Sequence, residues 1–168
     1  VSADLDELSR TNVSVVCAGI KSILDIGRTL EYLETVGVPV ISFQADEVPA
    51  FYARSSGYKS DYRIDSAKDA AKALHAKYDL NIHGSILVTN PVPEEYALDP
   101  KDIDQTIAEA IKEMDKQGIT GKDTTPFLLA RIAEQTGGES LDTNIKLVLN
   151  NAKLAAEIAV EYSRMNNG

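Results

Sequence analysis

The sequence lacks tryptophan, contains a single cysteine, and has no long uninterrupted apolar run in its 168 residues. A lone cysteine has no partner for a disulfide, and the position of Cys17 in a short apolar segment predicts a reduced thiol in the core. No apolar run approaches the roughly 20 residues of a membrane-spanning helix, and the first residues lack a charged-then-apolar signal pattern. We therefore expect a cytoplasmic protein with no membrane partner.

Basic residues are outnumbered, with 17 Lys and Arg against 26 Asp and Glu, which gives a formal net charge of −9. This balance argues against nucleic acid or an anionic membrane surface as the main partner. A local pocket can still be basic, so a phosphorylated substrate remains compatible with the composition. The length corresponds to about one domain with a sizeable core.

Common signatures of catalysis are missing as well. The chain has neither a glycine-rich phosphate-binding loop nor a Gly-x-Ser-x-Gly elbow. His75 and His83 have no cysteine or histidine at a spacing suited to zinc. We predict no metal ligand within this chain.

Short apolar runs alternate with amphipathic segments along the first 90 residues. The runs predict strands at 13–18, 39–43 and 85–89, and the amphipathic segments predict helices at 4–10, 22–35, 66–78, 101–117, 126–136 and 140–165. This alternation predicts an α/β fold with three α/β/α layers and a mostly parallel sheet. Three strands are few for so many helices. We therefore expect an incomplete sheet, with residues 1–168 forming the C-terminal portion of a single domain.

The turn after the first predicted strand carries one lysine, Lys21, directly behind Gly19 and Ile20. In open α/β sheets, ligands bind at the carboxyl ends of the strands. An amine at that position can act as a nucleophile that forms an imine with a carbonyl substrate. The alternative is a loop lysine that only solvates the turn, and the spacing leaves both interpretations open.

The last predicted helix contains Asn144, Asn150 and Asn151, although asparagine is a poor residue for a helix interior. At least one of them is expected to have a task other than helix formation. An irregularity of helix capping is the alternative.

Several ordered segments of the chain resemble the pseudouridine-5'-phosphate glycosidase family. The longest is VVCAGIKSILDIG at residues 15–27, and the others lie at 2–5, 29–35, 90–93, 125–131 and 144–152. The resemblance runs from Val1 to about Val160 without large gaps and covers roughly the C-terminal half of a family member. It implies reversible cleavage of pseudouridine 5'-phosphate to uracil and ribose 5-phosphate, a divalent metal that is typically manganese, and a homotrimer.

The resemblance also assigns roles to residues. It makes Lys21 the nucleophile that forms an imine with the opened ribose, so that the carbon–carbon bond to uracil can break. It places Ser2, Ala3 and Asp4 at the substrate and makes Asn144 a polar contact in the same cleft. The apolar residues of the last helix that should then pack inward are Ile145, Leu149 and Ala152.

The resemblance places three family residues upstream of Val1: a metal-binding aspartate, a glutamate that donates a proton, and a lysine that contacts phosphate. We therefore expect the chain to be inactive by itself. Should it turn over alone, the acid has to be sought among the carboxylates near strand ends, which are Asp25, Asp46 and Glu47.

Two alternative functions remain open. One is a related imine-forming lyase or synthase of C-glycosides that acts on another pentose phosphate. The other is a non-catalytic helical interaction module, which predicts an exposed Lys21 with no cleft beside it.

Overall fold

The computed structural model describes residues 3–21 and 24–166. Four parallel strands form the sheet: β1 (Ser14–Cys17), β2 (Val40–Phe43), β3 (Tyr62–Ile64) and β4 (Ile86–Thr89), in the spatial order β1-β4-β2-β3. The predicted α/β fold with a parallel sheet is confirmed. Because all strands run the same way, their carboxyl ends meet at one edge of the sheet.

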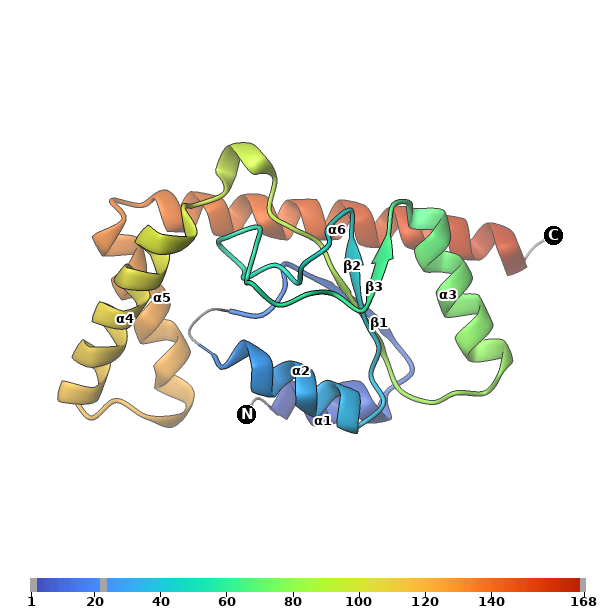
Figure 1. Cartoon of the computed structure of the whole chain (residues 1–168), viewed down its shortest axis with the longest axis horizontal. Helices are drawn as coiled ribbons and strands as arrows, with labels where there is room; N and C mark the ends of the chain where they lie inside the picture. The colour runs from blue at the N-terminus through green and yellow to red at the C-terminus, as the bar shows by residue number, and fades with distance from the viewer. Residues whose placement is uncertain (1–2, 22–23, 167–168) are drawn as a thin grey trace.

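Helices cover both faces of the sheet, as the apolar character of the central strand requires. Helices α1 (Ala3–Arg10) and α2 (Ile26–Thr35) lie on one face, and α3 (Ala67–Asp79) and α6 (Glu139–Asn166) lie on the other (Figure 1). All four residues of β4 are buried. Its Leu87 packs against α1 and α2, whereas Ile86 and Val88 pack against α3 and α6.

Two further helices, α4 (Pro100–Lys116) and α5 (Thr124–Gln135), pair beside the three layers, at the left of Figure 1. Short turns of 3₁₀ helix, η1 (Glu94–Tyr96) and η2 (Gly121–Asp123), precede them. Their shared core contains Tyr52 from the loop after β2, together with Ile103, Ile107, Leu128 and Ile132.

Two elements differ from the sequence prediction. Strand β3 was not predicted, because three residues with an exposed tyrosine and arginine show no apolar alternation. Helix α2 begins at Ile26 rather than near residue 22, since Asp25 caps it by accepting a hydrogen bond from the backbone N–H of Arg28 at 3.0 Å. Ser22 and Ile23 lie outside the described residues.

The inward face of α6 also differs from the prediction. The side chains of Ile145 and Leu149 are 50% and 61% exposed, and Ala152 is exposed as well, so the expected packing of these three residues is wrong. The helix instead buries Ser140, Thr143, Leu147, Leu154 and Ile158. Apolar residues occur on both sides of this helix, so the pattern alone does not select the buried face.

The buried side chain of Lys77 fixes the connection from α3 to β4. Its Nζ donates hydrogen bonds of 2.7 Å to the backbone carbonyls of Ile82, His83 and Gly84. The ammonium therefore satisfies three carbonyls of a turn that enters the central strand.

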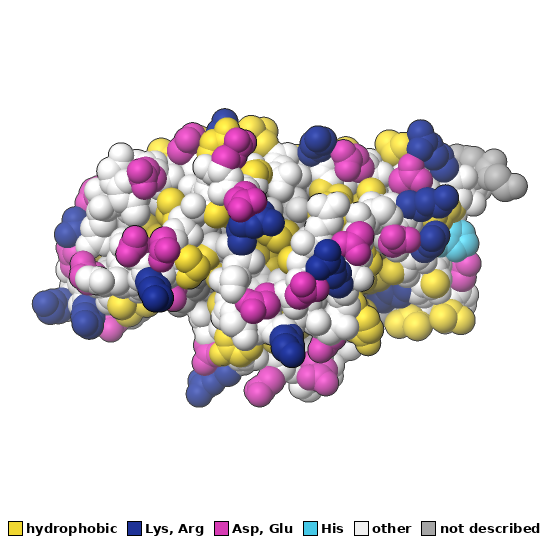
Figure 2. Space-filling view, turned by 45° about the horizontal axis from the view of Figure 1, so that its top comes forward, with side chains coloured by type: hydrophobic (Ala, Val, Ile, Leu, Met, Phe, Trp, Pro, Cys, Tyr) yellow, Lys and Arg dark blue, Asp and Glu magenta, His cyan; other side chains and the backbone are white. Residues whose placement is uncertain are grey.

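The surface mixes both signs of charge. On the face shown in Figure 2, acidic and basic side chains are interspersed, and no broad basic area covers it. None of the described helices is long and apolar enough to cross a membrane.

Candidate active site

Lys21 lies just beyond the carboxyl end of β1 and is half-buried. The backbone of the preceding residues packs against the loop that follows β2: Ile20 N donates to Pro49 O at 3.2 Å, and Phe51 N donates to Ala18 O at 3.0 Å. Gly19 makes this close approach possible, because a Cβ at that position would lie 1.8 Å from the Pro49 carbonyl oxygen. Its φ of +89° also suits glycine alone. The lysine is thus placed by backbone contacts.

A groove of about 850 Å³ opens beside Lys21 along the α1 and α2 face of β1. Asp4 of α1 and Cys17 of β1 line it together with Lys21. Thr124 and Thr125, at the start of α5, also line it. The fold therefore brings two of the predicted site residues, Asp4 and Lys21, to one cavity.

The thiol of Cys17 is a second nucleophilic group among the described residues that line this groove. Burial raises the pKa of Cys17 to about 11, and a hydrogen bond with the backbone of Gly19 only partly opposes this. The thiol keeps its proton at neutral pH, and a protonated thiol is a poor nucleophile. The thiol is therefore a poor candidate for covalent chemistry.

The asparagines of α6 divide into two groups. Asn151 Oδ1 accepts a hydrogen bond of 3.2 Å from Asn90 Nδ2, and Asn150 Nδ2 donates to Pro91 O at 3.2 Å. Both hold the loop after β4, and Asn90 itself, 4% exposed, was not singled out from the sequence. Its signals were its position directly after a buried strand and its place in the segment 90–93 that resembles the family.

Asn144 is half-buried one helical turn before Leu147, and it does not line the groove that holds Lys21. Leu147 packs against Ala18 and Val92, so this part of α6 lies over the end of β1. Ser2 lies outside the described residues, and Ala3 begins α1. The contacts of these residues with substrate stay predictions.

The three carboxylates considered as acids have other partners. Asp25 caps α2 and pairs with Arg28 at 3.3 Å, and Asp46 pairs with Arg63 at 2.8 Å. Glu47 accepts hydrogen bonds from the Ser55 hydroxyl and from Gly57 N. The bond from Ser55 is the main cause that lowers the pKa of Glu47. A carboxylate with a lowered pKa is poorly suited to donate a proton near pH 7.

Within residues 3–21 and 24–166, no group of three or more His, Cys, Asp or Glu side chains could hold a metal ion. Asp4 and Glu7 both line the groove, but they do not form such a group. The described residues do not make a metal centre by themselves.

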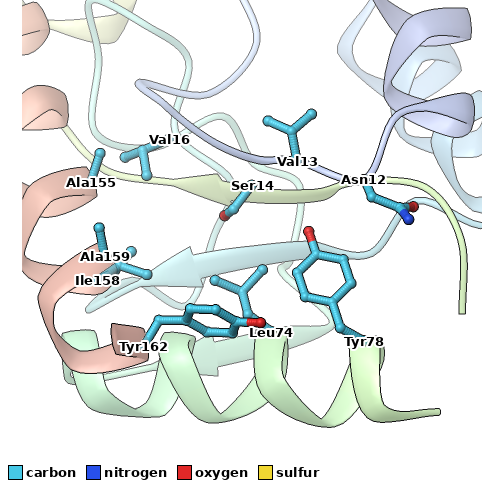
Figure 3. Close-up of a pocket in the computed structure, with 10 residues that line it drawn as sticks. All are labelled: Asn12, Val13, Ser14, Val16, Leu74, Tyr78, Ala155, Ile158, Ala159 and Tyr162. Atoms are coloured by element: carbon cyan, nitrogen blue, oxygen red, sulfur yellow. The ribbon is translucent and has the colours of Figure 1, made fainter. Parts of the chain in front are cut away.

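A smaller pocket of about 240 Å³ lies on the other face of β1, between α3 and α6 (Figure 3). Leu74 and Ile158 line its apolar part, and the rings of Tyr78 and Tyr162 border it. None of the predicted site residues lines this pocket. The groove beside Lys21 is therefore the candidate active site.

Sequence comparison connects the chain with known enzymes. Residues 1–161 match the family described as "Indigoidine synthase A like protein". The chain is 57% identical over 166 residues to a pseudouridine-5'-phosphate glycosidase of Clostridium botulinum, and 53% identical over 165 residues to one of Escherichia coli. These matches cover 99% and 98% of this chain but only 54% and 53% of the relatives. The chain thus spans about half the length of the curated relatives it matches.

Two solved structures share the fold. The prealnumycin C-glycosynthase AlnA, in complex with ribulose 5-phosphate, aligns with a TM-score of 0.90 and 36% identity. An indigoidine synthase A-like protein from Thermotoga maritima aligns with a TM-score of 0.87 and 38% identity. The alignments cover 99% and 96% of this chain and 55% and 53% of those chains. The chain therefore belongs to the indigoidine synthase A-like family, in which its curated relatives are pseudouridine-5'-phosphate glycosidases.

Proposed function

We propose that this chain carries the imine-forming lysine of an enzyme that reversibly cleaves pseudouridine 5'-phosphate to uracil and ribose 5-phosphate. The observation that carries the proposal is the position of Lys21, which is half-buried at the carboxyl end of a parallel strand and lines a groove large enough for a sugar phosphate. The names of the relatives supply the substrate.

The reaction needs an amine because carbon is a poor leaving atom. The ribose opens as the bond from C1' to O4' breaks, Lys21 Nζ bonds to C1', and the proton that the amine releases goes to O4'. The nitrogen lone pair then forms the C1'=N bond as the bond from C1' to uracil C5 breaks. The electrons of the broken bond pass to uracil C5, which takes up a proton. Water then hydrolyses the imine, which releases ribose 5-phosphate and frees the amine.

The remaining parts of the proposal concern binding. Asp4 would accept hydrogen bonds from sugar hydroxyls in the groove, with Ser2 and Ala3 beside it, and Asn144 would contact the substrate from α6. The manganese ion would be held by residues of the relatives that lie outside the match, since the described residues form no metal centre. The homotrimer belongs to the same proposal, and light scattering of the complete protein would test it.

Trapping of the imine tests the proposal directly. Incubation with ribose 5-phosphate and a borohydride reductant should add one pentose phosphate to the peptide that contains Lys21, as read by mass spectrometry. Lys21→Arg should give no adduct, because a guanidinium keeps its proton and cannot act as an amine nucleophile. Lys59→Arg, which changes a lysine of a different loop in the same way, should be labelled like the parent.

An adduct that survives Lys21→Arg, or one that maps to another lysine, would contradict the assignment. The imine itself would be contradicted if the parent chain formed no adduct, either alone or after addition of the remaining half of a relative.

A second candidate function is the synthesis of a different C-glycoside. It is favoured by one observation, which is that AlnA, a C-glycosynthase of the same fold, was solved in complex with ribulose 5-phosphate. The same Lys21 would then serve a synthase that joins another pentose phosphate to a different carbon nucleophile. Product analysis with uracil and with alternative nucleophiles separates the two functions. The helical interaction module is disfavoured, because it requires an exposed Lys21 without a cleft, whereas Lys21 borders the groove.

We also propose that this chain is the C-terminal portion of one larger domain. Strand β1 is an edge strand of uncharged residues, and apolar hollows lie on both of its faces. Natural sheets protect exposed edges with charges or cover them. The edge at β3 carries such charges, since Arg63 pairs with Asp46 and Asp65. Edge β1 has none, which supports its pairing with a further strand.

A further inference from the structure

Phe51 has an unusual backbone conformation for a bulky residue. Its φ is +67°, and the other non-glycine residues with positive φ in the described part of the chain are Gln44 and Asn81. The left-handed region costs free energy in L-residues because Cβ crowds the following carbonyl. Such strain persists only where surrounding contacts hold it, and it is found preferentially at functional sites.

The contacts that hold Phe51 come from the segment that carries Lys21. Phe51 N donates to Ala18 O at 3.0 Å, and Ile20 N donates to Pro49 O at 3.2 Å, which joins the two segments on either side of Gly19. A third bond, from Ala50 N to Ala53 O at 3.0 Å, closes the turn around Phe51. The strained residue and the lysine are therefore fixed to one another through the backbone.

The ring of Phe51 lies under the amine. Lys21 Nζ is 5.3 Å from the ring centroid, which is within the range of a cation–π contact. Tyr52 supports the ring from the side, with centroids 4.9 Å apart and the planes at 79°. Ala18 and Leu147 belong to the cluster against which the ring packs. The ring is thus held on several sides and presents its face to Nζ.

A carboxylate at this place would hold a proton on the amine and compete for it during catalysis. No Asp or Glu of the described chain forms a salt bridge with Lys21. An aromatic face attracts a cation only weakly and offers no acceptor to a neutral amine. It can therefore orient the charged side chain and competes less for its proton than a carboxylate would.

We infer that Phe51 is a positioning residue that holds Lys21 Nζ at the carboxyl end of β1, beside the groove, and that the strained backbone at Phe51 is retained for this purpose. The inference rests on the proposed imine chemistry of Lys21. It adds a residue that acts through Lys21 and need not touch the substrate.

The contact can be measured without catalysis. Reductive methylation of the full chain with ¹³C-formaldehyde places NMR-visible methyl groups on each Nζ, and comparison with Lys21→Arg assigns the signal of Lys21. Methyl groups over a ring face are displaced upfield by the ring current. We expect this displacement for Lys21, its retention in Phe51→Tyr, and its loss in Phe51→Leu.

The consequence for chemistry is measured by the rate of borohydride trapping with ribose 5-phosphate. Phe51→Leu should lower the rate at Lys21 by about tenfold or more, since misplacing a reacting group by about 1 Å costs of order 10²-fold. Phe51→Tyr should stay near the parent rate. Phe43→Leu is the matched control, because Phe43 is half-buried in a different cluster at the end of β2.

The outcomes separate the two claims. An upfield signal that depends on Phe51, with no trapping on the parent chain, supports the positioning contact and counts against the imine function. Trapping that is equal in the parent and Phe51→Leu overturns the positioning role while the function stands. Circular dichroism checks folding, and if Phe51→Leu does not fold, Phe51→Met makes the same comparison with an unbranched side chain.

Discussion

At the scale of single residues, Gly19 determines whether the loop after β2 can approach the end of β1. Replacing it with alanine would put a Cβ 1.8 Å from Pro49 O on a backbone with φ of +89°. We expect Gly19→Ala to lower the free energy of unfolding by about 3 kcal/mol or more. Urea denaturation measures this effect.

Gly37→Ala is the control for Gly19→Ala. Gly37 also has a positive φ, +73°, but a Cβ there would meet no atom within 4 Å. It should cost only about 1 kcal/mol, which is the conformational cost alone. An equal loss of unfolding free energy in the two variants would show that the close approach to Pro49 does not add to the cost of Gly19→Ala.

Cys17 should react slowly in the folded protein. With its pKa near 11, the thiolate fraction of Cys17 at pH 8 is on the order of 100-fold smaller than that of a thiol with a pKa of 9. Alkylation by iodoacetamide should therefore be slow in buffer and fast in urea. Equal rates in both conditions would contradict the burial of the thiol.

The same thiol makes stability depend on alkaline pH. The folded state holds the proton of Cys17 up to about pH 11, whereas the unfolded chain releases it near pH 9. The free energy of unfolding should thus fall as the pH rises between these values, and Cys17→Ala should reduce this slope. Below pH 8 the two proteins should show the same pH dependence.

The buried ammonium of Lys77 should contribute to stability through its three carbonyl partners. Lys77→Met leaves these acceptors without a donor, so we expect a loss of roughly 2 kcal/mol or more in the free energy of unfolding. Lys68→Met on the same helix is the exposed control and should change stability by less than about 0.5 kcal/mol. A loss in both variants would indicate an effect of charge rather than of these hydrogen bonds.

At the scale of elements, α6 should respond differently to the loss of each asparagine. Alanine is the better helix former, so Asn144→Ala should leave stability unchanged or raise it. Asn151→Ala removes the partner of the buried Asn90 amide, and we expect it to be less stable than Asn144→Ala by about 1 kcal/mol. Thermal melts of both variants make the comparison.

The borohydride trapping assay tests whether Asn144 contacts the substrate. If Asn144 contacts the substrate, Asn144→Ala should form less of the ribose 5-phosphate adduct at unchanged stability. A normal rate of adduct formation would remove it from the site.

Most elements were predictable from the sequence because their apolar residues recur at the spacing of a buried strand or helix face. The central strand β4 is apolar at three of its four positions, and the caps Asp25 and Ser66 are visible as residue types. The short strand β3 was not predictable, because only its pairing with β2 orders it. The start of α2 was placed four residues early, since the segment before Asp25 is also compatible with a helix.

The candidate site was predictable only in part. Lys21 and the strand that carries it stand out in sequence, because a glycine interrupts an apolar run immediately before a lysine. Phe51 and Asn90 did not stand out as site residues, because their roles arise from contacts that are distant in sequence. Phe51 contacts Lys21, and Asn90 bonds to Asn151 over a separation of 61 residues. The position of Asp4 in the groove follows from the packing of α1 on the sheet, which no local pattern encodes.

At the scale of the whole molecule, we expect the 168-residue chain alone to cleave no pseudouridine 5'-phosphate, even with manganese. The described residues supply the amine but no metal centre, and the carboxylates near strand ends have structural partners. General acid catalysis alone contributes roughly 10²–10⁴-fold. Adding the other half of a relative, in trans or fused, should restore uracil release, as followed by chromatography.

A fused chain with Lys21→Arg is the control for that experiment and should remain inactive. Metal-dependent turnover by the 168-residue chain alone would contradict the expectation. Hydrogen exchange at β1 provides a second measurement, because an added strand should protect amides of this edge.

The long helix α6 has a thermodynamic consequence. Its 28 residues contact α5, η1, β1 and α3, so the α4–α5 pair and the sheet share one continuous helix of roughly 42 Å. Neither part can melt without breaking hydrogen bonds in a helix that the other part stabilises. Heat absorption on unfolding should therefore form one cooperative peak, in which the van't Hoff and calorimetric enthalpies agree.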